Sequence, residues 1–153
     1  MRTVHILTTG KLRESGLRDF EAEYLKRLQL FQIQIHECKA YAEDLDLEAR
    51  DIILKVKDIQ KNSAALKIIG MMEKGRERDS VQLAQWLDQH FQAGSDLILI
   101  IGGASGHGSE VQALFHEKMS LSLLTYPHQL ARVVLVEQLY RAQTILQGHP
   151  YHK

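Results

Sequence analysis

The chain has 153 residues with 19 basic and 19 acidic side chains, so its formal net charge is zero. This length is typical of one domain with its own core, and we expect a single domain over residues 1–153. Domains dedicated to binding free nucleic acid are usually strongly basic, so a neutral chain argues against that class. A local basic patch is still compatible with zero net charge.

The single cysteine, Cys38, excludes an internal disulfide and a zinc site made of several cysteines. It favours a reducing, cytoplasmic setting. The first apolar run is short and is soon followed by Lys11 and Arg13, which excludes a signal peptide. No stretch reaches the roughly 18 apolar residues of a membrane-spanning helix, so no membrane partner is expected.

Short apolar runs alternate with longer segments of helical periodicity along the chain. The predicted strands are residues 4–7, 31–36, 66–71, 97–101 and 121–125. The predicted helices are residues 17–30, 46–62, 81–93, a segment starting near Ser109, and 129–147. Strands that alternate with helices indicate an α/β fold with a mostly parallel sheet.

Three of these segments carry further information. Residues 31–36 alternate apolar with polar side chains, which predicts a half-exposed or edge strand. Residues 72–80 are predicted to be a polar loop, with Asp79 or Ser80 capping the next helix. The last helix is apolar nearly all round, so it is either the central core helix or a helix whose second side a partner subunit covers.

A glycine-rich loop runs from Gly102 to Gly108 directly after a buried strand. Glycine lets the backbone approach a ligand closely, and open α/β sheets bind ligands at the carboxyl ends of their strands. The loop lacks G-x-G-x-x-G, has Ser109 where a P-loop requires lysine, and has His107 where an elbow around Ser105 requires glycine. It is therefore not a typical dinucleotide, NTPase or serine-hydrolase loop, and the alternative to a ligand site is a plain strand-to-helix turn.

Several histidines and basic residues are further candidates for the site. His128 follows Pro127 and is a candidate general base or a capping histidine. His149 and His152 make a poor metal site, because catalytic zinc needs three protein ligands, so no metal is expected. The cations that could form a phosphate-binding rim are Lys74, Arg76, Arg78, Arg132 and Arg141.

Four blocks of the sequence together resemble the RlmH family, bacterial SPOUT-class methyltransferases of large-subunit ribosomal RNA. The blocks are residues 100–106, 120–128, 132–142 and 149–152. The resemblance extends over the whole chain in length and element order. It implies an α/β sheet with helices on both faces and a C-terminal part threaded into a trefoil knot, which is a rare arrangement. It also implies a homodimer with the last helix in the interface.

The resemblance further implies methylation of N3 of a pseudouridine in a 23S rRNA stem-loop, on the assembled ribosome, with S-adenosylmethionine as cofactor. The implied cofactor contacts are Met71, Gly102, Leu121, Ser122, Leu123, Leu124, Thr125 and Tyr126. Our hypothesis for the group that accepts the N3 proton is His128, with Glu137 as a second candidate. The residues assigned to RNA positioning are Arg132, Arg141, His149, Tyr151 and His152.

One departure from the family pattern concerns Met71-Met72, where members often have leucine followed by an acidic residue. The nearest carboxylate here is that of Glu73. Two other functions stay open from the residues alone. One is a non-catalytic ribosome-associated or nucleotide-binding α/β protein. The other is a SPOUT methyltransferase acting on tRNA, which the lack of an extra RNA-binding domain disfavours.

Overall fold

The computed structural model describes residues 1–42 and 44–153. The strands are β1 (Thr3–Thr9), β2 (Gln32–Cys38), β3 (Leu66–Glu77), β4 (Asp96–Ile101) and β5 (Glu117–Ser120). The helices are α1 (Ser15–Lys26), α2 (Leu45–Gln60), α3 (Ser80–Gln92), α4 (Ser109–Gln112) and α5 (His128–Leu146). Among the described residues, no helix is long and apolar enough to cross a membrane.

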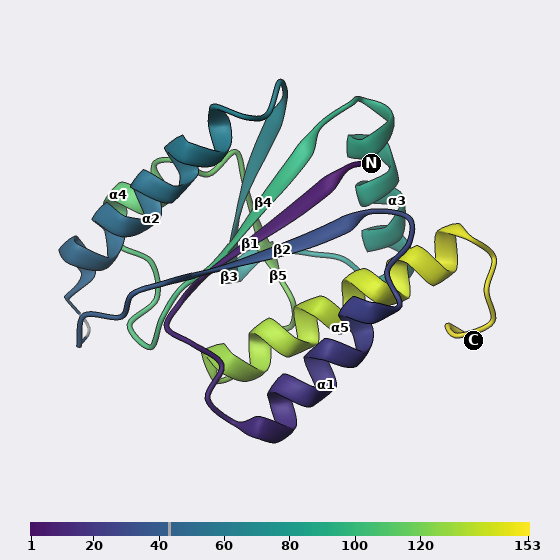
Figure 1. Cartoon of the computed structure of the whole chain (residues 1–153), viewed down its shortest axis with the longest axis horizontal. Helices are drawn as coiled ribbons and strands as arrows, with labels where there is room; N and C mark the ends of the chain where they lie inside the picture. The colour runs from purple at the N-terminus through teal and green to yellow at the C-terminus, as the bar shows by residue number, and fades with distance from the viewer. Residues whose placement is uncertain (43) are drawn as a thin grey trace.

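The strands form one parallel sheet in the order β2-β1-β4-β3-β5. Helices α1, α3 and α5 cover one face, and α2 and α4 cover the other (Figure 1). The predicted α/β fold with helices on both faces is confirmed. Because every neighbouring pair is parallel, all the carboxyl ends of the strands meet at one edge of the sheet.

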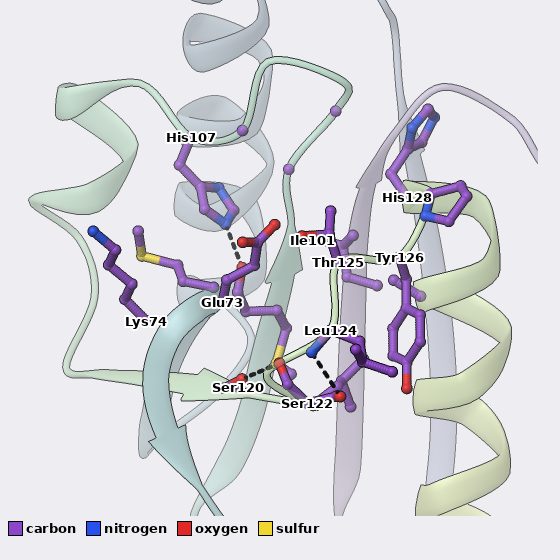
Figure 2. Close-up of a pocket in the computed structure, with 18 of the residues that line it drawn as sticks. Glu73, Lys74, Ile101, His107, Ser120, Ser122, Leu124, Thr125, Tyr126 and His128 are labelled. Atoms are coloured by element: carbon purple, nitrogen blue, oxygen red, sulfur yellow. Dashed lines mark hydrogen bonds between the residues drawn. The ribbon is translucent and has the colours of Figure 1, made fainter.

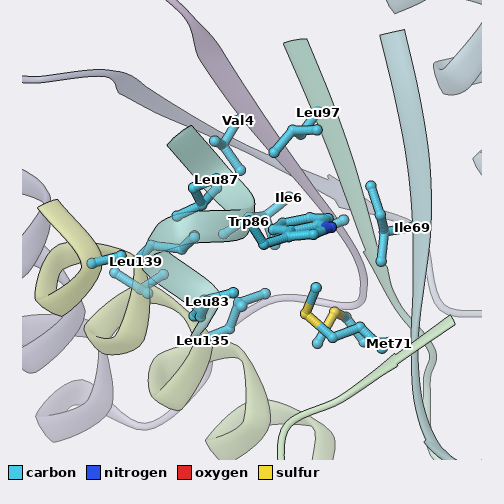
Figure 3. Packing of buried hydrophobic residues seen from close by; sticks show 14 of the residues in the cluster. Val4, Ile6, Ile69, Met71, Leu83, Trp86, Leu87, Leu97, Leu135 and Leu139 are labelled. Atoms are coloured by element: carbon cyan, nitrogen blue, oxygen red, sulfur yellow. The ribbon is translucent and has the colours of Figure 1, made fainter. Parts of the chain in front are cut away.

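The core lies on both sides of β1 and β4, the two strands at the centre of the sheet next to β3. Both strands are continuous runs of buried residues, as expected for a parallel sheet covered on both faces. On the larger side, Trp86 and Leu87 of α3 pack with Leu135 and Leu139 of α5 against the sheet (Figure 3). This packing fixes α5 relative to the strand ends.

The edge strand was predicted correctly. In β2, exposed and half-buried side chains alternate, and the strand pairs only with β1. The helix cap was also predicted correctly, because Asp79 accepts a hydrogen bond from Gln82 N–H at 2.7 Å while the Gln82 side chain bonds back to Asp79. Helix α1 ends at Lys26, four residues before the predicted end.

Two predictions around β3 and β5 were wrong. Residues 121–125 are not a strand, since β5 ends at Ser120 and the apolar run after it forms an irregular loop. Residues 72–77 are not a loop, since β3 continues to Glu77. The reason is pairing with β5: Met71 and Arg76 both lie opposite Met119, so the residues between them form a bulge and the strand then resumes.

Helix α5 is buried on most of its circumference within one subunit, where it contacts α1 and α3. Its Arg132 is only 7% exposed. The guanidinium donates to both carboxylate oxygens of Glu21 on α1, at 2.8 and 2.9 Å, and to Glu37 on β2 at 2.6 Å. One buried cation therefore ties together a helix pair and the edge strand.

Candidate functional site

A pocket of about 800 Å³ opens at the carboxyl ends of β4 and β5, beside the bulge within β3. Three chain segments form its walls: residues 71–74, residues 101–107, and residues 120–131. This is the position and size range in which parallel α/β sheets bind small ligands. The glycine-rich loop and the loop after β5 thus meet in one site, although 13 residues lie between Gly106 and Ser120.

The glycine-rich loop is folded back tightly on itself. Gly106 N–H donates to the Gly103 carbonyl at 3.0 Å, and Gly106 has φ +76°, a conformation that favours glycine. A Cβ on Gly102 would lie 2.8 Å from the carbonyl carbon of Gly106. A side chain at Gly102 would therefore push apart the turn that forms one wall of the pocket.

His107 joins this loop to Met71, where the bulge of β3 begins, a role that sequence reasoning missed. Its Nε2 lies 2.9 Å from the Met71 carbonyl oxygen (Figure 2). Since a carbonyl only accepts, Nε2 carries the hydrogen, and Nδ1 is buried without a partner. Burial lowers the pKa of His107 against the effect of this hydrogen bond, so the imidazole is neutral near pH 7. Nothing in the sequence pattern distinguishes this histidine from a solvated loop residue.

Serine hydroxyls hold the loop after β5. Ser120 Oγ donates to the Ser122 carbonyl at 2.8 Å, and Ser122 Oγ accepts from Leu124 N–H at 3.0 Å (Figure 2). These local bonds replace a strand ladder, which is why an apolar segment stays irregular. The loop then enters α5 through Pro127.

Most of the predicted cofactor residues come together in the pocket. The predicted residues that line it are Met71, Gly102, Leu121, Ser122, Leu124, Thr125 and Tyr126. Leu123, which is 76% exposed, does not line it. Glu73 and Lys74, which belong to the β3 bulge, also line the pocket. A carboxylate is thus present in the wall despite the methionine at position 72.

The two proton-acceptor candidates are separated. His128, the first residue of α5, lines the pocket on the side opposite His107 (Figure 2). Glu137 lies nine residues further along α5, about 13 Å away by helix rise, and does not line the pocket. Its Oε1 accepts from Arg141 Nη2 at 2.7 Å and from the Tyr151 hydroxyl at 2.9 Å. Of these two candidates, only His128 lines the pocket.

The C-terminal residues fold back onto α5 rather than extending into solvent. Gly148, at φ +68°, donates to Ile145, and His149 N–H donates to Thr144 at 2.9 Å, a Schellman turn that reverses the chain. Beyond it, the Arg141 guanidinium lies over the Tyr151 ring and its Nη1 is 3.1 Å from His152 Nδ1.

We call Glu137, Arg141, Tyr151 and His152 the tail cluster. Burial and hydrogen bonds with Tyr24 and Glu137 raise the pKa of Tyr151, so its hydroxyl stays protonated. Arg141 is 13 residues from His128, about 20 Å along the helix, so one subunit does not bring the tail cluster to the pocket.

Three of the five predicted phosphate-binding cations form ion pairs within the chain, and one of them is Arg141, which pairs with Glu137 in the tail cluster. Arg132 is bound by Glu21 and Glu37, so its guanidinium supports structure instead of facing RNA. Arg78 pairs with Glu117 and lies over the Trp86 ring. The other predicted cations of the β3 bulge, Lys74 and Arg76, are exposed. In residues 1–42 and 44–153, no three histidine, cysteine or carboxylate side chains converge to hold a metal ion.

Comparison with known proteins identifies the family of this chain. The family model described as "Predicted SPOUT methyltransferase" matches residues 1–152. A ribosomal RNA large subunit methyltransferase H of Streptococcus thermophilus (strain CNRZ 1066) is 40% identical over 163 residues, covering 98% of this chain and 99% of the relative. A protein of the same name from Koribacter versatilis (strain Ellin345) is 37% identical over 150 residues, covering 97% of each.

Among solved structures, the SpoU methyltransferase AviRb of Streptomyces viridochromogenes superposes loosely. Its TM-score is 0.49 at 10% identity, covering 95% of this chain and 60% of that one. The family assignment does not depend on it. On the full-length match and the identity to curated relatives, this chain belongs to the SPOUT methyltransferase family.

Proposed function

We propose that this chain is a cytoplasmic, homodimeric enzyme that transfers a methyl group from S-adenosylmethionine to large-subunit ribosomal RNA. The proposed target is N3 of a pseudouridine in the assembled ribosome. The observation that carries the proposal is the pocket at the carboxyl ends of β4 and β5 and the β3 bulge, with His128 in its wall, in a chain of this family. The curated relatives named above support the choice of ribosomal RNA.

The residues of the pocket fit S-adenosylmethionine. Met71, Ile101 and Leu121 offer apolar contacts for the adenine ring, and the two loops offer backbone N–H and carbonyl groups. Glu73 supplies a carboxylate that suits a positively charged ligand. The tight turn at Gly102 leaves no room for a side chain, as expected where a backbone wall encloses a ligand.

Bound S-adenosylmethionine supplies a methyl group already activated on positively charged sulfur. The protein then has to align the attacking nitrogen and remove the N3 proton. His128 is the group we propose to accept or relay that proton, because its imidazole is in the pocket wall, where the target base would lie.

The homodimer part of the proposal follows from two separated features. The tail cluster and the pocket lie at opposite ends of α5, so a second subunit with an antiparallel α5 would bring its tail cluster to this pocket. Leu123 and Leu124 are 76% and 69% exposed beside the pocket, and Leu130 is 37% exposed on α5. Exposed leucines of this kind are typical of an interaction surface.

The test combines cofactor binding with methyl transfer. Calorimetry on the purified protein should show saturable binding of S-adenosylmethionine. Ribosomes, free large-subunit RNA and tRNA are then incubated with radiolabelled cofactor, and the product nucleotide is identified by mass spectrometry. We expect 3-methylpseudouridine in the ribosome sample. Label in tRNA instead would favour a tRNA enzyme, and no binding and no label would favour a non-catalytic ribosome-associated protein.

Replacing His128 with alanine should lower kcat on ribosomes by about 10²- to 10⁴-fold, the usual contribution of a positioned acid or base. The affinity for S-adenosylmethionine and for ribosomes should stay within about threefold. His90→Ala on α3 is the matched control, because it removes an imidazole outside the pocket. Full activity of His128→Ala would exclude this residue as the proton acceptor.

A further inference from the structure

The β1–α1 connection, residues 10–14, lies directly beside the pocket. A narrow crevice lined by Lys11 and Leu12 of this connection shares Gly102 and His128 with the main pocket. The connection therefore borders the reaction site on the α5 side, away from the β3 bulge.

The backbone of this connection is anchored on both sides. Gly10, at φ +87°, donates its N–H to the Cys38 carbonyl at 2.7 Å, which holds the connection to the end of β2. Leu12 is 3% exposed and donates its N–H to Glu37 Oε2 at 3.2 Å. Arg13 N–H donates to Gln129 Oε1 at 3.1 Å, next to His128. The backbone is thus fixed while the residues on either side of Leu12 point outward.

The two outward side chains are cations without an ion-pair partner. Lys11 and Arg13 are exposed, and neither forms a salt bridge with any residue that the structure describes. The Glu37 carboxylate, which feels the charge of Lys11, is hydrogen-bonded to Arg132 and to the Leu12 N–H instead. The acidic side chain that follows in the connection, Glu14, makes no side-chain cap of α1.

Resting on the function proposed above, we propose that Lys11 and Arg13 bind phosphates of the RNA backbone next to the target nucleotide. Cations on a fixed backbone lose less entropy when they bind than cations on a loop that must first be ordered. Arg132 acts as a positioning residue, since it holds Glu37 where Glu37 can hold the connection. Backbone contacts of this kind set the register of the nucleic acid without reading its bases.

The test compares Lys11→Ala/Arg13→Ala with wild type in binding to large-subunit ribosomal particles at several salt concentrations. We expect about tenfold weaker binding and a slope of log affinity against log salt smaller by about 1.5, as for the loss of two phosphate contacts. The matched control is Lys57→Ala/Lys61→Ala, which removes two exposed cations at the C-terminal end of α2. The control should bind like wild type.

The outcomes separate this proposal from the proposed function. Unchanged salt dependence in the Lys11/Arg13 variant, a changed affinity for S-adenosylmethionine, or a wild type that binds no ribosomal particle would each overturn the phosphate role. Methylation by that variant with the wild-type KM would overturn it while the enzyme assignment stood. Loss of salt-dependent binding in the variant, with no methyl transfer by wild type, would support the phosphate role and reject the enzyme assignment.

Discussion

Replacing Arg132 with alanine is expected to destabilise the folded chain by about 3–5 kcal/mol, the usual cost of leaving a buried charge without its partner. Glu21 is only 6% exposed and would keep its negative charge inside the protein. Urea unfolding at one fixed protein concentration measures the loss. The double variant Glu21→Leu/Arg132→Met should recover most of it, because it removes both buried charges.

An exposed ion pair serves as the control for Arg132. Lys26 lies 3.9 Å from Glu23, and both side chains are more than half exposed, so Lys26→Ala should cost at most about 1 kcal/mol. Equal effects of Lys26→Ala and Arg132→Ala would contradict the view that burial makes the difference.

The pH dependence of unfolding gives a second measure of the Arg132 network. Burial would raise the pKa of Glu37, but its hydrogen bonds with Arg132 and Leu12 N–H outweigh burial and lower that pKa. A lowered folded-state pKa contributes stability that is complete above the unfolded value near 4.5 and is lost as pH falls through the folded value. Arg132→Ala should reduce this acid-side loss.

Replacing Gly102 with alanine should weaken binding of S-adenosylmethionine by about 100-fold or more, equivalent to about 2.7 kcal/mol. The added methyl group would lie 2.8 Å from a backbone carbon of Gly106, and backbone cannot swing aside as the end of a flexible side chain can. The turn must open, which moves one wall of the pocket. Calorimetry with the purified variant measures the effect, and circular dichroism checks that the sheet is retained.

Gly108→Ala is the matched control, since it adds the same methyl group in the same loop. Gly108 has φ −71°, and the nearest atom to its added Cβ is Leu45 Cβ at 3.7 Å, an ordinary contact. This variant should bind the cofactor within about threefold of wild type. Wild-type affinity in Gly102→Ala would show that the tight turn is not part of the cofactor site.

The sequence allowed the sheet and most helices to be predicted because their patterns are local. Buried parallel strands such as β4 are uninterrupted apolar runs, and Asp79 with Gln82 is a readable capping pair. The strand predicted at 121–125 was wrong because its apolar pattern depends on Leu123 and Leu124. Their apolar side chains are exposed beside a pocket instead of buried in the core, and periodicity cannot tell these two situations apart.

The parts of the site that could not be predicted depend on contacts between distant residues. The bond from His107 to the Met71 carbonyl spans 36 positions, and the pair of Arg132 with Glu21 spans 111. No local pattern marks either partner. From the sequence we expect Arg132 to position RNA, whereas its guanidinium is buried and donates to Glu21 and Glu37. The two cations that we propose for RNA are separated by the buried Leu12.

The pocket walls come from residues 71–74, 101–107 and 120–131, so the binding site is completed only by the last strand and the start of the last helix. A nascent chain synthesised only as far as residue 110 would contain four of the five strands but would lack the third wall of the pocket. It should therefore not bind the cofactor. Ligand binding should therefore stabilise only the finished fold, by about 2.7 kcal/mol at a cofactor concentration 100 times Kd. The supply of cofactor in the cell would then also govern how long newly made copies survive proteolysis.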